Sequence, residues 1–126
     1  MARRSVTGDL FVWVGLTVLA VIFAVLGPMK LDPARFATRR ATAWARDLPP
    51  TTVRGIGVLE TLAAVALVWP LATRTLPWLS PLASACLTVL MACAALFHRR
   101  RGERDLTALC VVLGLLAAAV TVGILS

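Results

Sequence analysis

Four long apolar runs dominate this chain and constrain its fold more than any other feature of the sequence. They cover about residues 10–29, 56–71, 77–97 and 106–125, and each is close to the roughly 20 residues that a helix needs to cross a bilayer. Hydrophobic residues make up 60% of the chain and the mean hydropathy is +0.88, well above that of a water-soluble domain. We therefore expect one all-α domain, an antiparallel bundle of four transmembrane helices.

Basic residues lie outside these runs and are distributed unevenly. The first and third loops carry ten Lys and Arg residues, whereas the N-terminal tail and the second loop carry three. Because cytoplasmic loops are enriched in Lys and Arg, both termini are expected on the non-cytoplasmic side, although Arg3 and Arg4 alone favour the reverse. Trp13, Trp69 and Trp78 fall at the ends of the spans that lie away from the arginine-rich loops, which predicts an aromatic belt at that lipid interface.

The composition also indicates where the protein works and what it contacts. Tyr, Asn and Gln are absent, and one Lys stands against twelve Arg, a bias typical of a bacterial genome rich in G and C. We expect a multi-pass protein of the bacterial inner membrane. The net charge of +7 is placed beside the spans, so its expected partners are anionic lipid headgroups and not nucleic acid. Membrane or redox partner proteins and a homo-oligomer are compatible with this sequence.

The first loop is predicted to contain an amphipathic helix over about residues 33–48 that lies on the membrane surface. Asp32 is placed to cap it, Pro33 to occupy its first position, and the Pro49-Pro50 pair to end it. Its apolar face is expected to face the lipid, with Trp44 and Leu48 in the headgroup–acyl boundary, and the arginines of its other face are expected to contact lipid headgroups. The apolar face comprises Ala34, Ala37, Ala41, Trp44, Ala45 and Leu48, and the basic one Arg35, Arg39 and Arg46.

Glu60 is the only acidic residue inside an apolar run. If Arg54 marks the headgroup level, Glu60 lies six residues deeper, roughly 9 Å into the hydrocarbon. Lys30 ends the first span and His98 ends the third on the same side, so these four residues form a candidate polar cluster. Two interpretations compete: an ion pair with Lys30 or Arg54 that fixes the helices, or an unpaired carboxyl that binds a proton or a ligand.

Other motifs of site chemistry are weak. Cys86, Cys93 and Cys110 lie in apolar runs without a CxxC spacing. We interpret them as small packing residues, in preference to the alternative of a thiol redox pair or metal site. No metal ligand set, haem-ligand pair or nucleotide-binding loop is evident in the sequence. Catalytic residues are therefore unknown at this stage, and no cofactor is evident, although a quinone-like ligand fits the apolar setting.

Several short motifs, taken in order, resemble the DoxX-like family of membrane proteins. They are Gly27-Pro28-Met29-Lys30-Leu31, the segment from Arg54 to Glu60, Trp69-Pro70, and the stretch from Ala94 to His98 before an arginine-rich turn. The resemblance covers roughly residues 10–125. It implies a four-span protein related to a subunit associated with thiosulfate:quinone oxidoreduction and to membrane redox and oxidative-stress complexes. Lys30, Glu60 and His98 match its recurring polar positions.

Three functional hypotheses follow. The resemblance favours an accessory or binding subunit of a membrane redox or stress-related complex, more than a self-sufficient enzyme. A second hypothesis is a small membrane enzyme that binds an apolar substrate such as a quinone, with Glu60 and His98 in proton transfer. A third is a channel or transporter subunit, for which one buried acid in four spans provides little pathway.

Overall fold

The computed structural model describes residues 6–38 and 40–126, and nearly all of them are helical. Four of the described helices are long and apolar enough to cross a membrane, which confirms the predicted all-α bundle. They are α1 (Val6–Met29), α3 (Pro50–Thr73), α4 (Leu79–Arg100) and α5 (Arg104–Leu125). Between α1 and α3 the chain forms a short helix α2 (Pro33–Phe36) and a 3-10 helix η1 (Arg40–Asp47).

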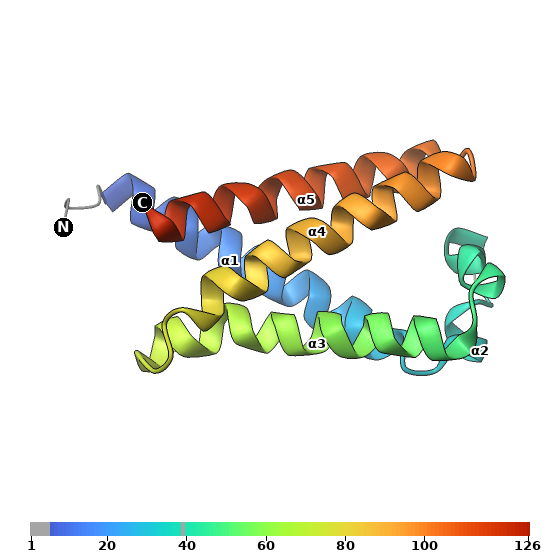
Figure 1. The fold of residues 1–126 in the computed structure, drawn as a ribbon, viewed down its shortest axis with the longest axis horizontal. Coiled ribbons are helices and arrows are strands. Elements are labelled where there is room, and N and C mark those ends of the chain that lie inside the picture. The colour runs from blue at the N-terminus through green and yellow to red at the C-terminus, as the bar shows by residue number, and fades with distance from the viewer. Residues whose placement is uncertain (1–5, 39) are drawn as a thin grey trace.

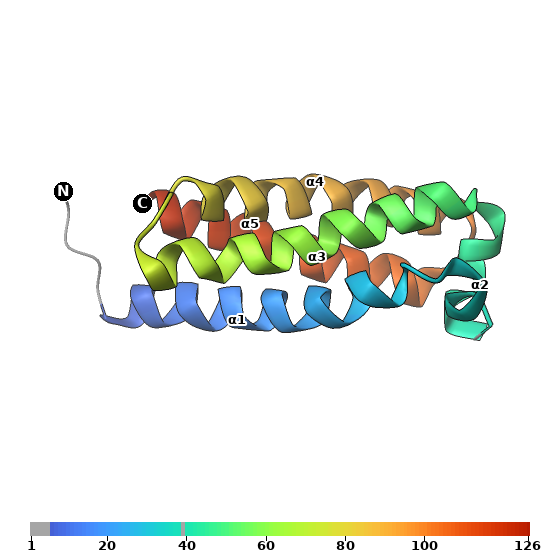
Figure 2. The same ribbon diagram turned by 90° about the horizontal axis from the view of Figure 1, so that it is seen from below.

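The four long helices form an up-down ring in which α1 and α4 each pack against both α3 and α5. The start of α1 and the end of α5 lie at one end of the bundle, and α2, η1 and the α4–α5 turn lie at the other (Figures 1 and 2). Each helix buries a narrow stripe at a spacing of three or four residues and exposes its remaining apolar side chains, as a lipid-facing helix does. The stripe of α1 consists of Val12, Leu16, Leu19 and Phe23.

Two glycines allow α1 and α3 to approach closely. A Cβ added at Gly57 would lie 2.6 Å from the carbonyl oxygen of Gly27, and one added at Gly27 would lie 2.9 Å from the carbonyl oxygen of Gly57. Any larger residue at either position would therefore push the helices apart. This crossing brings the end of α1 beside the middle of α3, which is where Lys30 and Glu60 meet.

Helix α3 begins six residues before the apolar run predicted over residues 56–71. Pro49 is the residue before α3 and Pro50 is its first residue, because proline fits the first helical position, where its missing N–H needs no partner. The Pro49-Pro50 pair therefore starts a helix and does not simply stop the preceding one. Similarly, α5 begins at Arg104 after Glu103, and Asp105 lies in its first turn.

The surface helix predicted over residues 33–48 is not continuous. Asp32 does cap its start, since its carboxylate accepts from the Arg35 N–H at 3.4 Å, but α2 ends at Phe36. Side chains then take the backbone carbonyls that an α-helix would use: the Thr42 hydroxyl donates to Phe36 O, and Arg46 Nε donates to Ala37 O at 3.0 Å. The segment folds back on itself as α2 and η1.

Candidate functional site

A buried ion pair joins the end of α1 to the middle of α3. Lys30 Nζ donates to Glu60 Oε1 at 2.6 Å, and the two side chains are only 9% and 1% exposed. The Gly27–Gly57 crossing positions this pair, because Lys30 follows Gly27 and Glu60 follows Gly57 by three residues each, about one turn along each helix. Glu60 Oε2 is the one buried side-chain nitrogen or oxygen atom without a hydrogen-bond partner in the described part of the chain.

His98, near the end of α4, is buried close to this pair and held by the α4–α5 turn. Its Nδ1 lies 3.0 Å from Glu103 Oε1, which also accepts from Arg101 Nε at 2.8 Å. Partial burial of the Glu103 carboxyl opposes its ionisation, but the hydrogen bonds from His98 and Arg101 prevail and lower its pKa. Arg101 also pairs with Asp47 at the end of η1, so a chain of polar contacts connects η1, the turn and His98.

Aromatic rings enclose the polar groups. The Trp44 ring meets His98 edge to face with centroids 5.2 Å apart, and it contacts Phe36 and Phe97 at 5.7 and 6.0 Å. Lys30 Nζ lies 5.9 Å from the Phe36 ring centroid and 5.7 Å from that of Trp44, within reach of a cation–π interaction. Trp44 therefore faces the interior of this end of the bundle, where the sequence predicted a lipid-facing position.

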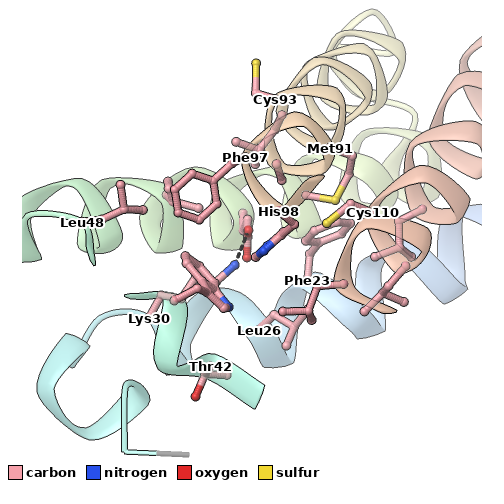
Figure 3. A pocket seen from close by; sticks show the side chains of 18 of the residues that line it. Phe23, Leu26, Lys30, Thr42, Leu48, Met91, Cys93, Phe97, His98 and Cys110 are labelled. Carbon is pink, nitrogen blue, oxygen red and sulfur yellow. Dashed lines mark hydrogen bonds and ion pairs between the residues drawn. The ribbon is translucent and has the colours of Figure 1, made fainter. Parts of the chain in front are cut away.

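These residues surround a cavity of about 360 Å³ at the end of the bundle that carries η1. Lys30, Glu60 and His98 form its polar part, and apolar side chains form nearly all of the rest. Figure 3 shows Lys30 and His98 converging from different helices, with Met91 and Cys110 beyond His98. The apolar lining comprises Phe23, Leu26, Phe36, Trp44, Leu48, Ile56, Leu90, Met91, Cys93, Ala94, Phe97, Leu106, Leu109, Cys110 and Leu113.

Of the predicted polar cluster, the structure brings together Lys30, Glu60 and His98, whereas Arg54 is exposed and forms no ion pair with any described residue. Of the predicted lipid-facing basic residues, Arg35 and Arg46 are exposed and Arg39 lies outside the described residues. At the opposite end, the predicted belt residues are all exposed: Trp13, Trp69 and Trp78.

The cysteines do not behave as one group. Cys86 and Cys93 are exposed on α4, so they do not serve the helix packing that the sequence suggested, whereas Cys110 is buried in the core. Cys93 and Cys110 both line the cavity. Within the described chain, His, Cys, Asp and Glu side chains form no cluster of three that could hold a metal ion.

Sequence reasoning missed the aromatic wall and the orienting carboxylate. Phe97 ends an apolar run in which one more ring gives no contrast, and Phe36 stands among the charged residues of the first loop. Glu103 belongs to a charged turn of ordinary appearance. One signal was available in the sequence. His98 is followed five residues later by Glu103, with Gly102 in the turn between them, and such a spacing allows a local hydrogen bond between the two side chains. The glycine pair of the α1–α3 crossing needed the tertiary structure.

The chemistry available at this site is binding more than bond making. A buried ion pair contributes little net stability, yet removing one partner leaves a charge in an apolar setting. The site thus combines a fixed carboxylate, an imidazole with a set orientation and a cavity large enough for a ring-shaped molecule. Such a constellation can position a polar headgroup.

Comparison with known proteins agrees with the architecture. Neither the curated proteins nor the solved structures contain a significant match to the chain. The family model of the DoxX-like family matches residues 14–120, a stretch that includes all of α3 and α4, most of α1 and α5, the Lys30–Glu60 pair and the cavity. The protein is a member of the DoxX-like family.

Proposed function

We propose that this protein is a membrane binding subunit that holds a lipid-soluble ligand with a ring-shaped headgroup, such as a quinone. The observation that supports this proposal is the cavity of about 360 Å³ with apolar walls and a polar end, the usual composition of a small-molecule site. We expect such a subunit to work in a membrane redox or stress-related complex, as the sequence resemblance implies. A buried ionisable pair in a membrane segment is costly, which favours a role beyond packing.

A ligand can reach this cavity from the bilayer. The exposed side chains of Thr52 on α3 and Cys93 on α4 both line it, so the cavity borders the protein surface between these helices. In Figure 1, α3 and α4 separate toward the end that carries η1. An apolar molecule dissolved in the membrane would enter sideways and would not need to cross water.

The test is to identify what copurifies with the protein in mild detergent by mass spectrometry. Ala94 lines the cavity, whereas Ala92 on the same helix is exposed and does not. Ala94→Phe should fill the cavity and abolish retention of a lipid-soluble molecule, and Ala92→Phe should retain it. Equal retention by both variants would place any ligand elsewhere, and copurification of a protein alone would favour an accessory role without a ligand.

A second candidate is a small enzyme in which Glu60 and His98 transfer protons to and from a bound apolar substrate. The observation that favours it is that both side chains line the same cavity, from which one substrate could contact both. Complementation of a deletion strain under redox stress tests this candidate. Glu60→Gln keeps the side-chain shape but cannot exchange a proton, so a stable and fully active Glu60→Gln protein would contradict it.

We further propose that the protein resides in the bacterial inner membrane with both termini on the non-cytoplasmic side. The uneven distribution of Lys and Arg supports this orientation. Exposed arginines at the end of the bundle that carries the cavity would contact anionic headgroups. These arginines include Arg35, Arg46, Arg54, Arg99, Arg100 and Arg104.

A further inference from the structure

The Lys30 ammonium is already engaged on the sides that face the cavity. Its Nζ donates to Glu60 Oε1 at 2.6 Å and lies 5.9 and 5.7 Å from the ring centroids of Phe36 and Trp44. The carboxylate and the cation–π attraction of the two rings therefore balance the charge of the ammonium. A ligand that accepts a hydrogen bond from Lys30 would have to compete with Glu60 for it.

The carboxylate, in contrast, has an unused acceptor. Glu60 is 1% exposed and lines the cavity, yet Oε2 has no hydrogen-bond partner in the described part of the chain. Leaving such an oxygen unpaired in an apolar interior carries a large desolvation cost. A donor brought by a ligand would remove that cost.

His98 presents a second acceptor. A carboxylate only accepts hydrogen bonds, so the contact of 3.0 Å to Glu103 Oε1 places the proton of a neutral imidazole on Nδ1. The other ring nitrogen, Nε2, is then an acceptor, and the described residues provide it with no hydrogen bond. Because His98 also lines the cavity, both free polar groups at this end accept and neither donates.

We propose that the ligand is a neutral ring-bearing molecule whose hydroxyl group donates to Glu60 Oε2: a phenol or hydroquinone, in preference to the corresponding quinone or ether. This inference rests on the proposed function and specifies the ligand of the same cavity. A carbonyl or ether oxygen would set an acceptor against a carboxylate oxygen, whereas a cationic amine would add a net charge to a site whose ion pair is already neutral. The rings of Phe36, Trp44 and Phe97 suit an aromatic headgroup.

The experiment compares 6-fluoro-2-naphthol with its methyl ether, which has almost the same shape but no donor. Binding to the full chain in lipid nanodiscs is measured by ¹⁹F NMR, and empty nanodiscs correct for partitioning into lipid. We expect the naphthol to bind at least about tenfold more tightly than the ether, as a hydrogen bond to a charged acceptor implies. Equal affinities above the empty-nanodisc level would overturn the donor requirement and leave the cavity as a ligand site.

Glu60→Gln replaces the acceptor Oε2 by a hydrogen-bond donor. If Lys30 keeps the amide oxygen as its acceptor, the amide NH₂ takes the place of Oε2, so the preference for the naphthol should disappear and the ether should gain affinity. Ser84→Ala, which removes a hydrogen bond to Thr121 away from the cavity, should keep the wild-type ratio. The wild-type comparison needs no variant and decides the matter even if Glu60→Gln does not fold. Binding of neither compound above the lipid control would remove the proposed function and this inference together.

Discussion

At the scale of single residues, the Lys30–Glu60 pair makes a sharp energetic prediction. Lys30→Met leaves the buried Glu60 carboxylate without its cation and should lower the free energy of unfolding by about 3–5 kcal/mol. Adding Glu60→Leu replaces the ion pair by an apolar one and should restore most of that loss, because two apolar groups carry no desolvation cost. Reversible unfolding in detergent measures both values. A single variant as stable as the wild type would show that the pair does not bury two charges.

The sequence could nominate the polar residues of the cavity but not its walls. Lys30, Glu60 and His98 are conspicuous because ionisable side chains in or beside apolar runs are rare. Trp44 was misplaced, since an amphipathic pattern cannot distinguish a lipid-facing ring from one that turns inward against Phe97. Arg54 was included in the predicted polar cluster because the sequence shows how far along a helix a residue lies. The direction of its side chain, in contrast, depends on the neighbouring helices.

At the scale of elements, the close crossing of α1 and α3 predicts opposite effects at two neighbouring glycines. Gly57→Ala would place a methyl group 2.6 Å from Gly27 O, so the helices must separate, at a cost of roughly 1–3 kcal/mol. Gly55→Ala meets nothing within 4 Å and should be neutral or stabilise α3 by up to about 1 kcal/mol. Unfolding in detergent compares them; equal effects would contradict the crossing.

The contact chain through the α4–α5 turn predicts a pH effect on η1. Glu103 has a lowered pKa because His98 and Arg101 donate to it, despite its partial burial. A carboxyl with a lowered folded-state pKa contributes stability above its ordinary value of 4.5, and this contribution is lost as the pH falls through the folded value. Below that pH the turn should release Arg101, its partner Asp47 and thus η1.

The emission of Trp44 reports this release, because its ring packs against His98. In a background in which the other three tryptophans are Phe, the emission should change in the acid range, at a pH below 4.5. Glu103→Gln removes the titrating group, so the change should vanish in that variant. An identical titration curve in both proteins would assign the effect to another carboxyl.

The elements themselves were predictable to different degrees. Apolar length alone locates the four long helices, because only a helix satisfies its backbone in hydrocarbon over such a stretch. The bounds depended on local chemistry that periodicity does not register: Pro50 extends α3 outward, and Thr42 and Arg46 take carbonyls that a continuous surface helix would need. Two side chains thus interrupt the short segment of the first loop.

At the scale of the whole molecule, the cavity lies at one end of the bundle, and the hydrogen bonds between side chains of the helix core lie toward the other. The end near the termini is held by apolar stripes and by hydrogen bonds inside the bundle, such as Ser80 Oγ to Leu67 O at 2.6 Å and Ser84 to Thr121 at 2.7 Å. The other end opens into the cavity, where α2 and η1 cover the space that the long helices leave.

Orientation in the membrane decides which compartment faces the cavity, and the positions of the termini make it testable. The ends of α1 and α5 that carry the termini lie together (Figure 2), so one labelled terminus reports the side of the entire end. In a variant in which Cys86, Cys93 and Cys110 are Ala, Ser126→Cys should react with an impermeant maleimide in spheroplasts. Arg100→Cys should react only after permeabilisation, because the proposed orientation places the arginine-rich loops in the cytoplasm. The reverse pattern would place the cavity at the outer surface and remove the cytoplasmic leaflet as the source of its anionic lipid partners.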